Sequence, residues 1–172
     1  MPARDVAIPI VFPDYLITVA DRPRRIDVPD FLPGIPDEVT IPNRMPYLGH
    51  AGILFFDGRS GLTKYYEYGR YDPPANRGKV RRQPIPDVQI LRDGRPAAAS
   101  LKRTLRVIAA QSGQGGRILA AYAELSEGAF DRMLARATAR EHDNSRRDVR
   151  GLHPNLDFKP PAALRIQGIT LS

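Results

Sequence analysis

The sequence contains no cysteine, and lysine makes up few of its 26 basic residues. The absence of cysteine excludes disulfides, cysteine-ligated zinc and a cysteine nucleophile within this sequence. No run of about 18 apolar residues occurs, which excludes a membrane-spanning helix. Residues 1–19 lack a basic segment followed by an unbroken apolar stretch, because Pro9, Pro13 and Asp14 interrupt them. We therefore expect no cleaved secretory signal.

What is present is typical of a folded domain. The 172 residues are 42% hydrophobic and 26% charged, which predicts one domain over residues 1–172 with a real core. The formal net charge is +7. This charge permits binding to nucleic acid or to an anionic surface. The arginines are scattered, however, which favours a solvated basic surface and makes nucleic acid an unlikely partner.

The N-terminal third combines β-branched residues with repeated prolines. Residues 4–19 are predicted to be extended, but Pro9 and Pro13 favour an edge or interrupted strand because proline cannot donate to a ladder. Residues 20–46 are predicted to form a long proline-rich loop, either a cover over a groove or a plain surface excursion. Residues 73–98 are predicted to be irregular, with one short extended segment at Val88–Leu91.

A β-hairpin is predicted between residues 50 and 71. Residues 51–57 are mostly apolar, residues 58–61 favour a turn, and residues 63–71 alternate with many aromatics. A four-residue loop places His50 opposite Gly69 and makes Glu67 its diagonal neighbour on the same face of the sheet. A loop one residue longer or shorter would put the two side chains on opposite faces.

The C-terminal half is predicted to be largely helical. Ser100 is a candidate N-cap for a helix that ends near Ser112, and a second apolar stripe predicts a helix from Glu127 to Asp143. The type of the apolar segment at 118–125 stays open. A polar, proline-broken tail begins at Ser145, and residues 166–171 are predicted to form a last strand.

His50 and Glu67 are the strongest candidates for chemistry. A histidine beside a carboxylate is a common base and orienting pair, because the carboxylate fixes the tautomer. The alternative is a strand-edge histidine with a purely structural hydrogen bond. His142, at a helix end, and His153, in the tail, are interpreted as structural. Three dispersed histidines do not predict a metal site, and no cofactor is expected.

The tyrosine-rich segment at residues 65–72 admits three interpretations. The tyrosines could serve sheet packing, line a substrate groove together with Glu67 and Arg70, or stack on bases beside arginines.

Several segments resemble a known family. They are Ile8–Tyr15, Leu48–Leu54, Gly61–Asp72 and Ser112–Arg117, and together they are similar to NlpC-type papain-like proteins, in particular the circularly permuted members among type VI secretion effectors. The resemblance covers residues 6–145. It implies a papain-like α+β fold with a small antiparallel sheet, including the hairpin, packed against two or three helices. It also implies hydrolysis of amide bonds in peptidoglycan peptides.

The resemblance gives His50 the role of base and Glu67 that of orienting residue. Tyr66, Tyr68 and Arg70 become the expected substrate-binding residues. The family's cysteine nucleophile would follow the helix that ends near Asn144, but no cysteine is present there. Ser145 is the nearest hydroxyl to that position. An inactive homologue, a shortened gene and a different chemistry on the same scaffold all stay open.

Two further hypotheses accompany this one. The first rival is a non-catalytic binding module for peptidoglycan or an acidic protein partner, and the second is a nucleic-acid binder that rests on charge alone. As an effector, the chain is expected to be made in the bacterial cytoplasm and to act in the target cell's periplasm. An immunity protein and a component of the secretion apparatus are then its expected partners.

Overall fold

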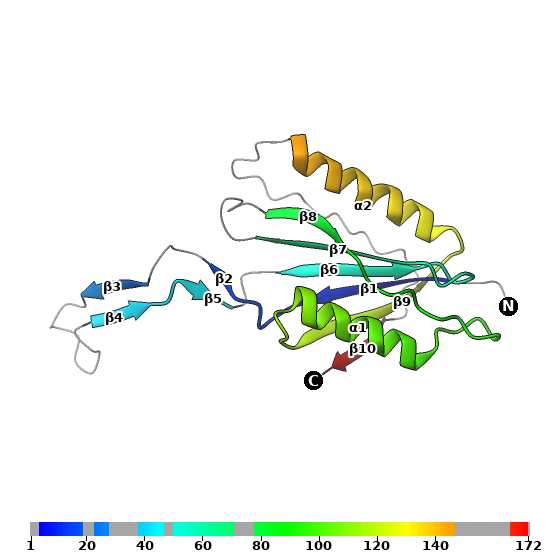
Figure 1. Ribbon diagram of the computed structural model, residues 1–172, viewed down its shortest axis with the longest axis horizontal. Helices are drawn as coiled ribbons and strands as arrows, with labels where there is room; N and C mark the ends of the chain where they lie inside the picture. The colour runs from blue at the N-terminus through cyan, green and yellow to red at the C-terminus, as the bar shows by residue number, and fades with distance from the viewer. Residues whose placement is uncertain are drawn as a thin grey trace.

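A computed structural model describes residues 4–18, 23–27, 38–46, 50–70, 78–146 and 166–171. Within them, a six-stranded antiparallel sheet carries one helix on each face (Figure 1). The strand order is β10-β9-β1-β6-β7-β8. This arrangement confirms the predicted α+β class. The elements are β1 (Asp5–Val11), β6 (Ala51–Phe56), β7 (Thr63–Arg70), β8 (Gly78–Gln83), α1 (Ala98–Ser112), β9 (Ile118–Leu125), α2 (Ala129–Arg146) and β10 (Ile166–Leu171).

The first strand lies in the middle of the sheet, so the edge alternative was wrong, whereas the predicted interruption occurs between β1 and residues 17–18. β1 pairs with β6 along its length and with β9 on its other side. The pairing with β9 lapses at Ile8 and Pro9 and resumes at Ile10. A proline therefore fits a central strand here, because its missing donor falls in the gap of one ladder.

The described part of the proline-rich segment forms strands instead of a loop. β2 (Ile17–Thr18) pairs with β5 (Arg44–Met45), and β3 (Arg24–Asp27) pairs with β4 (Glu38–Ile41). The β3–β4 pair extends away from the six-stranded sheet (Figure 1). This pair therefore does not form the cover over a groove that one interpretation of residues 20–46 predicted; residues 20–22 and 28–37 of that segment lie outside the described residues.

Alternation along the strands divides the core into two layers. On one face, Leu54, Phe56 and Tyr65 pack with the apolar stripe of α1, which includes Leu105 and Ile108. On the other face, Phe55 and Tyr66 of the hairpin and Val80 of β8 pack with Phe130 of α2. Successive strand residues point to opposite faces, so one hairpin supplies both layers.

Two details of the helices and strands differ from the prediction. α1 begins at Ala98 and its N-cap is Ala97, without a side-chain cap. Ser100 lies inside the first turn, where its hydroxyl donates to the carbonyl of Ala97 and accepts from the N–H of Gln89. The sequence prediction also missed β8, because among its six residues only Val80 is apolar and buried.

A buried carboxylate connects the first strand to the second helix. Asp5 is 2% exposed, and its two oxygens accept backbone N–H groups from Gly58 and Phe130. Phe130 lies in the first turn of α2, where N–H groups have no partner within the helix. Asp5 therefore caps α2 from a strand 125 residues earlier in the sequence.

Candidate functional site

His50 and Glu67 meet on the α1 face of the sheet. Nε2 of His50 lies 3.3 Å from Oε2 of Glu67, and both side chains are fully buried. The hairpin has the predicted register, since Phe56 pairs with Thr63 and Gly52 pairs with Glu67. The predicted approach of His50 and Glu67 is therefore confirmed.

Glu67 is held by donors at both of its oxygens. Oε2 also accepts the hydroxyl of Tyr65 at 3.3 Å, while Oε1 accepts Nε2 of Gln83 at 2.9 Å and Nε of Arg81. Gln83 and Arg81 come from β8, which pairs directly with β7. These contacts fix the carboxylate so that one oxygen is directed at the imidazole.

The surroundings hold the pKa of Glu67 well below its ordinary range. Burial by itself raises this pKa, because it penalises the charged form. The hydrogen bond from His50, the nearby hydroxyl of Ser112 and the hydrogen bonds from Gln83 and Arg81 lower it and outweigh the burial. The hydroxyl of Ser112 is buried at the end of α1 without a hydrogen bond of standard geometry, but its dipole still favours the carboxylate. Glu67 is therefore anionic at neutral pH.

The imidazole is enclosed and does not face an open groove. His50 is 2% exposed. Tyr15 stacks on its ring with centroids 4.1 Å apart and planes 8° apart, and Phe12 lies against it at 5.0 Å. A Cβ on Gly69 would lie 1.9 Å from Nδ1 of His50, so only glycine leaves room for the ring there.

The segment that carries Tyr15 is attached to the loop after α1. The side-chain amide of Gln114 exchanges hydrogen bonds with the backbone of Leu16. Asp14 accepts the backbone N–H and the guanidinium of Arg117. These partners are exposed, and their contacts are among those that would have to break for Tyr15 to move off the imidazole.

Two of the expected groove residues lie on the wrong face of the sheet. Tyr66 is 2% exposed and stacks with Phe55, and its hydroxyl lies 3.2 Å from that of Thr138 in α2. Tyr68 packs against the same cluster. Residues 66 and 68 alternate with Glu67, which directs them away from His50. Arg70 pairs with Gly78 at the end of β7, and its side chain lies outside the described residues.

The expected nucleophile position is not brought to the imidazole. Ser145 lies in the last turn of α2, which continues to Arg146 and packs on the face opposite His50. His142 is exposed near the same helix end, and His153 lies outside the described residues. Sequence reasoning missed Tyr15, Arg81 and Gln83. Of the residues around Glu67, only Tyr65 could be predicted from the sequence, because alternation along the strand places it on the same face of the sheet as Glu67.

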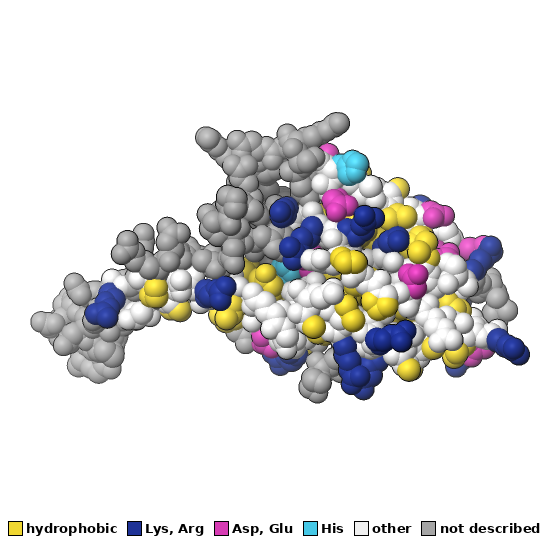
Figure 2. Space-filling model, in the orientation of Figure 1, with side chains coloured by type: hydrophobic (Ala, Val, Ile, Leu, Met, Phe, Trp, Pro, Cys, Tyr) yellow, Lys and Arg dark blue, Asp and Glu magenta, His cyan; other side chains and the backbone are white. Residues whose placement is uncertain are grey.

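Neither a metal-binding cluster among the described residues nor a basic stripe on the face in Figure 2 accompanies this site. The described residues contain no group of three or more His, Cys, Asp or Glu side chains that could hold a metal ion. In the same part of the chain, no helix is long and apolar enough to cross a membrane. Lysine and arginine side chains are scattered among apolar and neutral atoms on the face in Figure 2. That view shows no continuous basic stripe of the kind a nucleic-acid backbone would follow.

Comparisons with known proteins place this α+β chain among secreted bacterial effectors. The model of the type VI secretion system effector TseH-like family matches residues 7–149, and the chain belongs to this family. A solved structure, that of the type VI secretion system effector TseH, is 30% identical with a TM-score of 0.62. The match covers 87% of this chain and 67% of that one. The comparison with curated proteins gave no match.

Proposed function

We propose that this effector hydrolyses amide bonds in peptidoglycan peptides, with His50 as general base and Glu67 as its orienting residue. The observation that carries the proposal is the 3.3 Å contact between two fully buried side chains, one of them an anion held by further donors. A buried ionised carboxylate is costly to maintain, and buried groups with shifted pKa values cluster at functional sites. The resemblance to NlpC-type papain-like proteins is the source of the proposed substrate class, and membership in the effector family supports a target in another cell.

The geometry defines how the pair would work. Oε2 of Glu67 accepts the proton on Nε2, which leaves the lone pair of the neutral imidazole on Nδ1. When the imidazole takes a proton from a nucleophile, the nearby carboxylate stabilises the resulting cation. Tyr15 covers the face of the ring and Gly69 lies against Nδ1, so catalysis requires that the 12–17 segment moves and that the ring turns away from Gly69.

The nucleophile is the open part of the proposal. A thiolate is excluded within this sequence, so the attacking group is a hydroxyl or a water activated by His50. Ser145 is retained only as the hydroxyl nearest to the family position. A Ser145→Ala variant with unchanged hydrolysis would remove it from consideration.

The decisive experiment incubates the purified chain with peptidoglycan and measures released peptides by mass spectrometry. We expect release by the wild type and by His142→Ala, and loss of release in His50→Gln. Thermal unfolding of each variant shows whether His50→Gln is folded. Equal release by a folded His50→Gln variant would overturn the role of His50.

A second candidate function is a binding module for peptidoglycan or for an acidic protein. The absence of cysteine and the burial of His50 under Tyr15 favour it. Here we expect the chain to sediment with peptidoglycan, without releasing peptides, and to do so equally in the wild type and in His50→Gln.

The effector role also suggests the compartment in which the chain acts and a protein that binds it. We infer delivery into a neighbouring cell and action in its periplasm, with an immunity protein in the producing cell. Co-expression of a cognate binding protein should then relieve growth inhibition caused by a periplasm-directed form of the chain. Inhibition only by a cytoplasm-directed form would contradict the inferred location.

A further inference from the structure

A small cavity opens at the other end of the α1 face, between β1, β9 and the loop before α1. Its volume is about 230 Å³. The wall nearest the core is apolar and is formed by Val6 and Phe56, which are 2% and 0% exposed, together with Pro96. Such a wall excludes water from one side of any group placed there.

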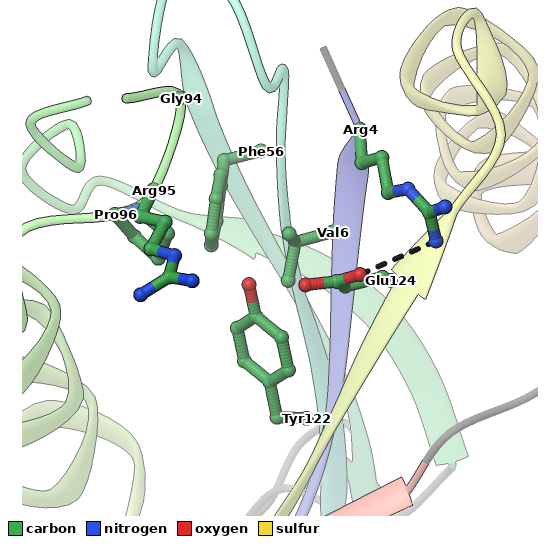
Figure 3. A pocket seen from close by; sticks show the side chains of 8 residues that line it. All are labelled: Arg4, Val6, Phe56, Gly94, Arg95, Pro96, Tyr122 and Glu124. Carbon is green, nitrogen blue, oxygen red and sulfur yellow. Dashed lines mark hydrogen bonds and ion pairs between the residues drawn. The ribbon is translucent and has the colours of Figure 1, made fainter. Parts of the chain in front are cut away.

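Polar groups gather on the remaining side of the cavity. Figure 3 shows the hydroxyl of Tyr122 and the guanidinium of Arg95 directed towards the same space. Arg4 also lines it but is paired with Glu124 at 3.4 Å. Among the residues that the structure describes, the Arg95 side chain makes no ion pair or hydrogen bond. The lining therefore carries one uncompensated positive charge beside a hydroxyl.

The loop that presents Arg95 is fixed by its own hydrogen bonds. The N–H of Leu91 donates to the carbonyl of Arg95, and the N–H of Gly94 donates to that of Leu91. The carboxylate of Asp93 accepts the N–H of Arg95. Gly94 has a φ of +82°, a conformation that glycine adopts without strain. Arg95 is thus attached to a preformed backbone, which lowers the entropy cost of binding.

We propose that this cavity is a binding site for a small amphipathic carboxylate, such as an N-acylated amino acid or the last residue of a peptide. The carboxylate would pair with Arg95 and accept a hydrogen bond from Tyr122, and the apolar body would lie against Val6 and Phe56. Arginine suits this ligand because its planar fork matches a carboxylate. Glu124, which also lines the cavity, repels a doubly charged phosphate more strongly than a singly charged carboxylate.

This site is separate from the His50 pair. Pro96 lies just before the start of α1, whereas Ser112, near Glu67, is its last residue. A helix of 15 residues spans about 22 Å. The proposal therefore does not depend on amide hydrolysis and fails or stands independently.

The test uses the full chain and NMR chemical-shift titration at low ionic strength, with N-acetyl-leucine as the probe. Three further probes separate the contributions: N-acetyl-leucinamide lacks the charge, acetate lacks the apolar body, and inorganic phosphate carries a different anion. A small ligand in a cavity of this size binds weakly, so we expect saturation at about millimolar concentration. N-acetyl-leucine should bind at least fivefold more tightly than the other three.

Arg95→Gln should weaken N-acetyl-leucine binding about tenfold, since it removes a charge-assisted hydrogen bond. Tyr122→Phe should weaken it about threefold. Arg92→Gln is the matched control, because Arg92 is an exposed neighbour in the same loop that does not line the cavity. A hexapeptide that ends in leucine distinguishes a polypeptide end from a free amino acid, and both results support the carboxylate site. Equal binding of acid and amide, no binding at all, or equal effects of Arg95→Gln and Arg92→Gln would overturn it.

Discussion

The two faces of the sheet use the same strands for opposite purposes. The α2 face is apolar through its centre, where Phe55 packs between Tyr66 and Phe130. The α1 face is equally buried but carries His50 and Glu67 within its core. Tyr65 and Tyr66 are adjacent in sequence, yet one donates to a carboxylate and the other packs on a ring. A tyrosine-rich strand thus does not by itself indicate a groove. Successive side chains point to opposite faces of the sheet, so adjacent tyrosines contact different neighbours.

The largest expected effect lies on the apolar face. Phe55→Ala should lower the free energy of unfolding by about 4 kcal/mol, because it removes a fully buried ring and leaves a cavity. Guanidinium denaturation at pH 7 and pH 4 measures this loss, which should be similar at both values. A loss that changes strongly with pH would mean that the two faces are electrostatically coupled.

The polar face should instead respond to acid. Glu67→Gln should lower the free energy of unfolding at pH 7 by about 3 kcal/mol, since it removes one partner of a buried charged cluster. Folding lowers the pKa of Glu67, so its contribution is complete above the ordinary glutamate pKa of 4.5 and is lost progressively as the pH falls below that value. The difference between wild type and variant should therefore narrow in acid. A difference that is constant from pH 7 to pH 3 would contradict the lowered pKa.

Gly69 tests the position of the imidazole directly. Gly69→Ala places a methyl group against Nδ1 of His50, and we expect a loss of about 2 kcal/mol together with displacement of the ring. Combined with Glu67→Gln, the loss should be smaller than the sum of the two single losses, because both changes act on one pair. Additive losses in this double-mutant cycle would show that His50 and Glu67 are independent.

The smallest effects compare the two adjacent tyrosines. Tyr65→Phe removes a buried donor to a carboxylate and should cost about 1.5 kcal/mol, whereas Tyr66→Phe removes a contact with Thr138 and should cost about 0.5 kcal/mol. Only Tyr65→Phe should change the acid dependence of unfolding. Equal effects of the two substitutions on that dependence would break the distinction between the faces.

Local sequence patterns predicted elements whose partners are close in the chain. The turn at 58–61 set the register that joins His50 to Glu67, and residues 166–171 form β10 as expected. Distant partners were not predictable in this way. β8 has a polar sequence, and only in the folded structure do Arg81 and Gln83 bind Glu67. The central position of β1 depends on its pairing with β9, which lies more than a hundred residues later in the chain. The enclosure of His50 by Tyr15 depends on the same kind of distant contact.

The placement of Asp5 has a consequence for how the chain folds. The first strand to be synthesised cannot complete its contacts until residues 118–130 have been made, because both β9 and the start of α2 come from that region. Closing such a long loop costs entropy before any contact compensates for it. We expect folding to be slow and post-translational, and Asp5→Ala to accelerate unfolding more than it slows folding, since the helix cap forms late.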